Sequence, residues 1–237
     1  MKVSLVSHTP EAAELLIFTK STRLTLTANL LDEIRSWPED RKREELAYMA
    51  RTIPSSWEFV DYVFSIEGVS RAYTHQQVRT RAGSYAQQTM RVLEMGDFDY
   101  VFTERNLSDP TTVEWIERHN AATRETYAAL LARGQAPEDA RGILPTNIAT
   151  NIVCKFNLRT LSELARSRTG GRTQDEYRRV INAMIDAVLL VHPWAGEFLF
   201  PRGRNIFTEI EALADTLSQE RRAALLKAVD ALRKELS

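Results

Sequence analysis

Two arginine-rich stretches hold most of the side chains that could do chemistry in this sequence. Residues 74–91 read THQQVRTRAGSYAQQTMR, and residues 157–178 read NLRTLSELARSRTGGRTQDEYR. Guanidinium groups bind phosphate through paired hydrogen bonds, and glutamine amides can both donate and accept at the edge of a planar heterocycle. Together the two stretches predict a site for an anion that carries a planar ring.

Each stretch also has a simpler interpretation as a solvated, salt-bridged face, because charged side chains are mostly exposed. Two such clusters without a matching run of acids nevertheless favour anion binding. Arg168 follows Leu161 and Leu164 at helical spacing, so it ends an apolar stripe. An arginine in that position either extends its guanidinium to solvent or points it into a pocket.

The charge balance argues against a general attraction to nucleic acid. The 237 residues include 31 basic and 32 acidic side chains, for a formal charge of -1, so anion binding must come from local clusters. The single cysteine, Cys154, allows no internal disulfide and indicates a reducing compartment. The sequence shows no secretory signal and no apolar run of membrane length, and its histidines are scattered. We therefore expect a cytoplasmic protein without a metal site.

Self-contained catalytic motifs are missing from the sequence. It contains no G-x-G-x-x-G fingerprint, no phosphate loop and no G-x-S-x-G nucleophile motif. Gly170 and Gly171 follow a predicted helix and are typical of a helix-ending turn. Cys154 lies among apolar residues without an evident base, as a buried structural cysteine does. Any catalysis is therefore expected to depend on a bound cofactor.

The elements that must position these side chains form a single α+β domain, with helices around a small sheet. Periodicity and composition predict strands at about 3–6, 57–66 and 143–156. They predict helices after Pro10 and at about 36–50, 68–80, 110–133, 158–168 and 173–191, with 84–92 as a loop or irregular strand. The domain is expected to span 1–237, with C-terminal helices at about 204–237 as an appendage.

At these residues the sequence resembles the flavin-dependent thymidylate synthases, the ThyX family. That family carries an R-H-R, seven residues, S signature within a stretch similar to GVSRAxxHQxVRHRxxSxSQxSxRY, which matches residues 68–92 here. Its LP…NxRSLxxFxxLR…AQxEIR pattern resembles residues 144–145, 157–168 and 173–178, and its SPFEH resembles residues 55–59. The matched frames span about residues 55–178 in the right order.

The resemblance implies a mixed fold and a homotetramer with active sites between subunits. It implies FAD as cofactor, with NADPH as reductant and methylenetetrahydrofolate as carbon donor. The implied reaction is reductive methylation of uracil C5 in a nucleotide, with no attack by an enzyme cysteine. The substrate is either dUMP or, in a specialised relative that serves nucleoside antibiotic biosynthesis, UMP. No nucleic acid or membrane is an implied partner.

The resemblance also implies roles by position. The residues expected to contact flavin are Arg79, Thr80, Arg81, Gln87, Asn157, Arg159 and Arg172, with Ser55 as a further candidate. The residues expected to contact the nucleotide are Gln76, Arg79, Gln87, Gln88, Thr89, Met90, Arg91, Arg141 and Arg168. Arg91 and Arg141 are assigned to the phosphate. Arg168 and Thr89 are the expected catalytic residues, with the fixed charge of Arg168 facing the uracil oxygens.

Several positions depart from the family pattern. The central histidine of R-H-R is Thr80, the last serine is Thr89, and the tyrosine after Arg91 is Val92. Ile53 and Arg172 also stand where the family has histidines.

These departures leave two hypotheses beside an ordinary thymidylate synthase. One is altered discrimination between UMP and dUMP, and the other is a catalytically silent homologue that binds nucleotide or flavin. A nucleic-acid-binding module fits poorly, because no platform of aromatic side chains for base stacking is evident.

Overall fold

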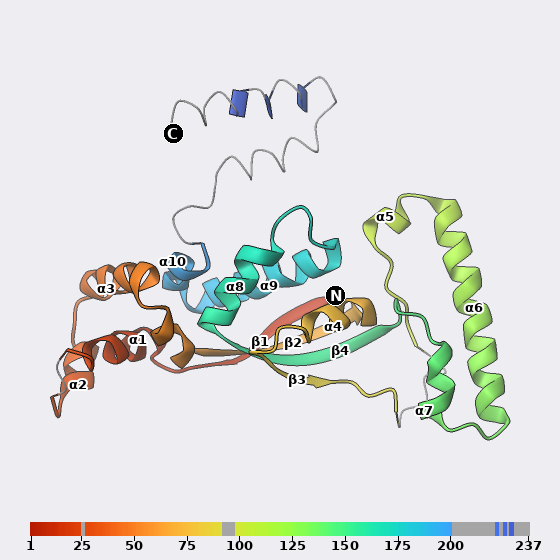
Figure 1. The fold of residues 1–237 in the computed structure, drawn as a ribbon, viewed down its shortest axis with the longest axis horizontal. Coiled ribbons are helices and arrows are strands. Elements are labelled where there is room, and N and C mark those ends of the chain that lie inside the picture. Colours follow the sequence, from red (N-terminus) through yellow and green to blue (C-terminus); the bar gives the residue numbers. More distant parts are fainter. Residues whose placement is uncertain (25–26, 92–97, 201–220, 223–224, 227, 230–237) are drawn as a thin grey trace.

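A four-stranded antiparallel sheet crosses the middle of the molecule (Figure 1). The computed structural model describes residues 1–24, 27–91, 98–200, 221–222, 225–226 and 228–229. The sheet has the order β1-β2-β4-β3. Its strands are β1 (Lys2–His8), β2 (Asp61–Ser70), β3 (Ser84–Gln87) and β4 (Ala149–Asn157). The mixed α+β fold expected from the sequence is confirmed.

The helices α8 (Leu158–Arg168) and α9 (Asp175–Val191) cover one face of the sheet together with α4 (Arg71–Gln77) (Figure 1). Alternate residues of β4 are buried, among them Ile152, Cys154 and Phe156, as expected for a strand with one face on the core. The α9 stripe of Val180, Ile181, Met184, Ile185 and Val188 is buried as its period predicts. The buried structural role of Cys154 is also confirmed, and burial raises the pKa of its thiol to about 12.

A block of helices lies at one end of the sheet. It contains α1 (Ala12–Ser21), α2 (Leu30–Arg35), α3 (Glu39–Thr52), the 3-10 helix η1 (Pro54–Phe59), η3 (Pro193–Ala195) and α10 (Gly196–Leu199). The indole nitrogen of Trp57 donates to the Met49 carbonyl at 3.1 Å, which joins η1 to α3. The apolar side chains of this block are continuous with the core of the sheet.

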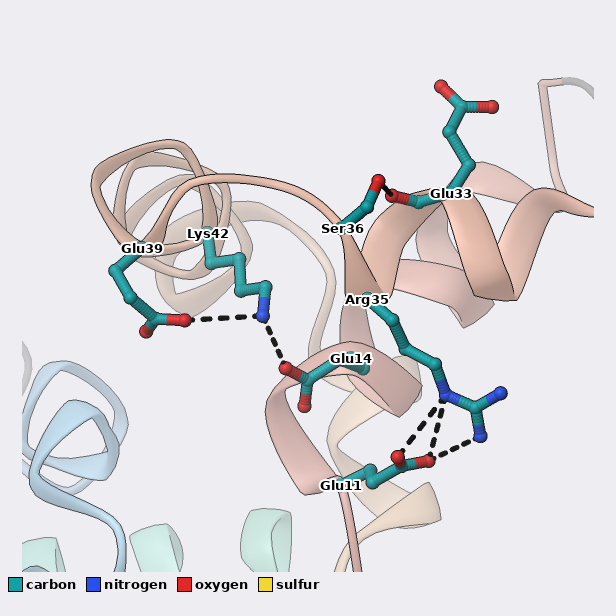
Figure 2. A network of polar contacts seen from close by, with 7 residues as sticks. All are labelled: Glu11, Glu14, Glu33, Arg35, Ser36, Glu39 and Lys42. Carbon is teal, nitrogen blue, oxygen red and sulfur yellow. Dashed lines mark hydrogen bonds and ion pairs between the residues drawn. The ribbon is translucent and has the colours of Figure 1, made fainter.

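Ion pairs join the first three helices (Figure 2). The ammonium of Lys42, which is almost fully buried, donates to Glu14 at 2.7 Å and to Glu39 at 3.2 Å. Arg35 pairs with Glu11 at 2.5 Å. Burial alone would raise the pKa of Glu14, but hydrogen bonds from Lys42 and the backbone, with the charges of Lys42 and Arg35, together outweigh it, so that pKa is lowered. Part of the charge on the helix predicted at 36–50 therefore forms ion pairs between helices.

The opposite end of the molecule carries a separate arm (Figure 1). It consists of α5 (Glu104–Leu107), α6 (Pro110–Ala132), α7 (Pro137–Ala140) and η2 (Arg141–Ile143). Asp109 caps α6 through the Thr111 backbone N–H, and Pro110 stands at its first position, as the sequence predicts. The arm has its own small apolar cluster, formed by Phe98, Tyr127, Ala140 and Ile148.

Three predicted boundaries were wrong, each for a local reason. The 57–66 strand begins at Asp61, because Pro54 starts η1 and holds residues 57–59 in it. The helix predicted from Gly68 begins at Arg71, because Gly68 lies in an irregular part of β2 with φ +66°. The 143–156 strand begins at Ala149, after a turn in which the Ile148 N–H donates to the Pro145 carbonyl.

The 84–92 segment forms a regular strand as far as Gln87. The C-terminal helices predicted at about 204–237 lie largely outside the described residues. Within the described ranges, no helix has both the length and the apolar character needed to cross a membrane.

Candidate functional site

Three guanidinium groups gather where the segment after β3 meets the arm. The Arg91 Nε donates to the Glu138 carboxylate at 2.7 Å, and the Arg141 Nε donates to the Glu138 carbonyl at 3.1 Å. Arg71 lies close enough to Arg141 for the second charge to act on its pKa. We call Arg71, Arg91, Arg141 and Glu138 the Glu138 cluster. The structure thus brings together the two arginines that the sequence assigns to phosphate.

Arg71 received no role from the sequence. Its Nη2 donates to the Gln88 carbonyl at 2.6 Å, while its Nε is buried without a hydrogen-bond partner. Burial, and secondly the Arg141 charge, lower the pKa of the Arg71 guanidinium, which still stays protonated because an arginine keeps its proton in proteins. A buried donor without a partner next to two further cations is a place where an anion gains hydrogen bonds.

The short helix α4, which begins at Arg71, is held in place by contacts with α9 and with the residue before β4. Ser70 caps α4, since its Oγ accepts from the Tyr73 N–H at 3.0 Å. The buried Glu176 carboxylate of α9 accepts from the Ser70 N–H at 2.7 Å and from its hydroxyl at 2.5 Å. The Arg71 N–H itself donates to the Ile148 carbonyl at 3.1 Å. Glu176 therefore fixes the start of the helix that carries Arg71.

The R-T-R segment forms a tight turn at the other end of α4. The Tyr85 hydroxyl contacts two carbonyl oxygens of this turn, that of Thr80 at 2.6 Å and that of Gln77 at 2.9 Å. Arg79 and Arg81 are exposed and form no ion pair within the described part of the chain. Their guanidinium groups are therefore available to a ligand.

Arg168, the expected ring-facing arginine, lies at the end of α8 against Tyr177 of α9. Its guanidinium carbon is 5.3 Å from the centroid of the Tyr177 ring. Burial raises the pKa of the Tyr177 hydroxyl, and Thr80 and Arg168 offset part of that rise. Arg168 is exposed and, among the described residues, has no acidic partner. The structure thus brings Arg168 next to the R-T-R turn.

The glutamines lie between these two places. The Gln87 amide donates to the Thr74 hydroxyl at 2.8 Å, and the Gln76 amide contacts Gln174 at the start of α9. Gln88 is held on both sides, because its backbone N–H donates to the Asn151 carbonyl at 3.0 Å and its carbonyl accepts from Arg71. The nucleotide-assigned glutamines therefore contact α4, β4 and the residue that precedes α9.

Thr89 and Met90 complete the segment after β3. The Thr89 hydroxyl accepts from the Arg91 N–H at 3.0 Å, which leaves its own proton free for a ligand. Met90 packs against the apolar cluster of the arm. This contact attaches the nucleotide-assigned segment to the arm.

Three of the remaining flavin-assigned residues lie at the other end of β4, whereas Arg172 follows the far end of α8. Asn157 caps α8, with its side-chain oxygen accepting from the Thr160 N–H at 2.8 Å. Arg159 donates to Glu58 at 2.6 Å and is also paired with Glu163 at 3.4 Å. Ser55 accepts from Arg23 at 2.9 Å. Arg172 is exposed in the turn between α8 and α9.

A shallow hollow of about 160 Å³ lies beside Arg159. It is lined by Pro54, Trp57, Arg159, Ser162, Glu163 and Arg166. The nine residues of β4, about 25 Å of extended chain, separate this hollow from the Glu138 cluster. One chain therefore does not bring all the predicted site residues together.

Sequence reasoning missed Arg71, Glu176 and Tyr177. All three lie inside the motif frames quoted above, so their positions were visible. The burial of Glu176 and Tyr177 could not be predicted from the sequence, because glutamate is rarely buried and the apolar stripe of α9 begins only at Val180.

Comparisons with known proteins give one consistent result. The family model described as thymidylate synthase complementing protein matches residues 4–194. A flavin-dependent thymidylate synthase of Nitratidesulfovibrio vulgaris is 34% identical over 198 residues, which cover 78% of this chain and 80% of that protein. A flavin-dependent thymidylate synthase of Sulfurisphaera tokodaii is 30% identical, covering 85% of this chain and 78% of that protein.

A solved structure shares the fold. It is a UMP/dUMP methylase, PolB, from Streptomyces cacaoi, bound with 5-Br dUMP. The TM-score is 0.74 at 21% sequence identity, and the match covers 86% of this chain and 96% of that one.

Proposed function

Because the chain belongs to the thymidylate synthase complementing protein family, the family of the flavin-dependent thymidylate synthases, we propose that it methylates C5 of a uracil nucleotide. FAD is the proposed cofactor, NADPH the reductant and methylenetetrahydrofolate the carbon donor. The substrate is dUMP or UMP.

The observation that carries this proposal is the Glu138 cluster. Three guanidinium groups gather around Glu138, whose carboxylate pairs with Arg91 while its backbone carbonyl accepts from Arg141. With one carboxylate among three guanidinium groups, the cluster keeps an excess of positive charge. A nucleotide monophosphate carries a charge of about -1.5 to -2 at neutral pH. Arg91 and Arg141 bind the phosphate, and the buried Nε of Arg71 supplies a further donor.

Arg168 acts on the uracil ring in this proposal. Its charge has no acidic partner among the described residues, so it is free to stabilise electron density on the ring oxygens. In this proposal the amides of Gln76, Gln87 and Gln88 hydrogen-bond to ring and sugar; Gln76 now contacts Gln174, and Gln87 contacts Thr74. The Thr89 hydroxyl, whose oxygen accepts from the Arg91 N–H, donates its proton to the nucleotide in this proposal.

The residues assigned to flavin fit an anionic dinucleotide. Arg79, Arg81 and Arg172 are exposed and lack ion-pair partners within the described chain, as a pyrophosphate site requires. Asn157 keeps its amide N–H groups available, because only its oxygen caps α8. Bound reduced FAD supplies the hydride of the proposed reaction. Arg159 joins the site when a ligand competes with Glu58 for its guanidinium.

The sites are proposed to be completed between the subunits of a homotetramer. The Arg159 hollow and the Glu138 cluster lie at opposite ends of β4. The arm also leaves the large apolar side chain of Trp115 64% exposed, as an interface residue of an assembly is in a single chain.

The test is purification with an absorbance spectrum, followed by NADPH oxidation and product analysis with dUMP and UMP side by side. We expect a yellow protein and a methylated nucleotide from at least one substrate. Colourless protein that cannot be reconstituted with FAD, and that yields no product, would contradict the proposal. That outcome would favour the catalytically silent homologue, which the Thr80 substitution motivates.

A further inference from the structure

Tyr177 is a fully buried tyrosine whose ring faces an exposed arginine. It lies in the first turn of α9, packed against the Tyr73 ring with centroids 5.3 Å apart. The guanidinium carbon of Arg168 lies 5.3 Å from the centroid of the same Tyr177 ring. A cation within about 6 Å of an aromatic face is attracted by it.

The hydroxyl of Tyr177 is not explained by packing. It is buried and makes no hydrogen bond of ordinary geometry. A buried hydroxyl without a partner destabilises a fold relative to phenylalanine in the same place. Its neighbours Thr80 and Arg168 are the groups that act on its pKa against the larger effect of burial. The oxygen therefore points to the place where two predicted ligand contacts meet.

The sequence changes on both sides of this contact. Tyr177 stands where the resembled motif has isoleucine, and Thr80 stands where it has histidine. One substitution adds a ring and a hydroxyl, while the other removes a ring. The two side chains are neighbours in the structure, so the larger residue at 177 accompanies the smaller one at 80.

We propose that Tyr177 is a positioning residue, whose ring, and to a lesser degree whose hydroxyl, holds the Arg168 guanidinium toward the uracil ring. This inference rests on the proposed function for the identity of the ring. An arginine at the end of a helix, without an ion-pair partner, loses several side-chain torsions when it binds a ligand. Contact with a buried ring removes part of that freedom beforehand, so less is lost on binding.

The test is a double-mutant cycle on the full-length protein with its flavin. The variants are Tyr177→Leu, Arg168→Ala and the double variant, with Tyr177→Phe as the conservative replacement. For each, kcat and KM are measured with the preferred uridylate, and the Kd of that nucleotide is measured by calorimetry. Melting temperature and flavin absorbance establish that each variant is folded and loaded.

Tyr177→Leu is expected to weaken kcat/KM by about 5- to 30-fold, as the loss of a partly desolvated cation–ring contact implies. Tyr177→Phe should restore it to within about 3-fold and keep the melting temperature, because the ring remains. In the Arg168→Ala background, Tyr177→Leu should add less than about 2-fold. Additive losses in the cycle would overturn the inference, since a purely structural role does not depend on Arg168.

The nucleotide Kd separates this inference from the proposed function. If the wild type binds a uridylate but forms no methylated product, the proposed reaction fails, and the same cycle in Kd decides the role of Tyr177. If the wild type turns over but the cycle is additive, only the inference fails. A wild type that binds neither uridylate overturns both.

Discussion

The Glu138 cluster and the surroundings of Arg159 use the same functional group in opposite electrostatic settings. Around Glu138, three guanidinium groups lie near one carboxylate, which pairs with Arg91, and the buried Nε of Arg71 has no partner. At Arg159, one guanidinium is held by two carboxylates, those of Glu58 and Glu163. The Glu138 cluster can bind an anion with its unpaired donors. At Arg159, an anion must first displace a carboxylate of the protein. Equal enrichment in arginine therefore does not mean equal readiness to bind.

The largest effect is expected from removing one of the arginines of the Glu138 cluster. Arg141→Met should weaken kcat/KM for the uridylate by about 10- to 150-fold, because a hydrogen bond to a charged group contributes about 1.5–3 kcal/mol. Steady-state kinetics measure it. Arg118→Met is the matched control, since Arg118 pairs with Glu114 on the exposed face of α6, and it should change kcat/KM by less than about 2-fold. Equal losses in both variants would contradict a specific role for Arg141.

A substitution at Glu176 should disturb the helix start that carries Arg71 without removing an arginine of the Glu138 cluster. Glu176→Gln should lower the free energy of unfolding by about 1–3 kcal/mol, because the Ser70 N–H and hydroxyl both donate to this buried carboxylate. Urea denaturation measures the change. Glu163→Gln is the control, and as part of an exposed pair it should cost less than about 0.5 kcal/mol. A stability as high as that of the wild type would show that Glu176 does not anchor α4.

The pH dependence of nucleotide binding should sharpen the contrast. A phosphate monoester gains its second charge near pH 6, so uridylate affinity at the Glu138 cluster should rise by about 3-fold from pH 5.5 to 7.5. The pyrophosphate of FAD has no second charge to gain in this range, and flavin retention should stay constant. Calorimetry at the two pH values measures uridylate affinity, and flavin absorbance after gel filtration measures flavin retention. A parallel rise in both quantities would contradict separate phosphate and pyrophosphate sites.

The smallest effect is expected at Arg159, whose charge is offset by Glu58 and Glu163. Glu58→Gln removes one competitor for Arg159 and should tighten FAD binding by about 2-fold, since exposed ion pairs contribute at most about 1 kcal/mol. Titration of the apoprotein with FAD measures it. Weaker FAD binding in this variant would mean that Glu58 orients Arg159 for the ligand instead of competing with it.

The sequence predicted much of the secondary structure but little of this contrast. Long periodic segments such as α6, α8 and α9 were predicted within about two residues, because capping and apolar period agree there. The start of α4 was wrong, since the positive φ of Gly68 belongs to an irregular strand that has no sequence signal of its own. Arg91 and Arg141, which the family resemblance assigns to one phosphate, both contact Glu138 in the structure, and their role stays a prediction.

The sequence could not predict which charged side chains pair with one another, because the partners lie far apart in the chain. Glu58 and Arg159 meet across 101 positions, and Glu176 meets Ser70 across 106. Composition counted these acids only as part of a balanced total. The burial of Tyr177 likewise follows from Tyr73 packing against it, which no local period reveals.

Gly83 has a consequence for how this protein tolerates change. A Cβ there would lie 2.7 Å from the Tyr85 hydroxyl oxygen and within 2.9 Å of the Phe156 ring. The R-T-R turn therefore rests directly on the strand that leads into Asn157. In a saturation scan of single substitutions, this half-exposed glycine should be as intolerant as a core leucine. Its neighbours Arg81 and Ser84, which are exposed, should accept many residues wherever ligand binding is not selected.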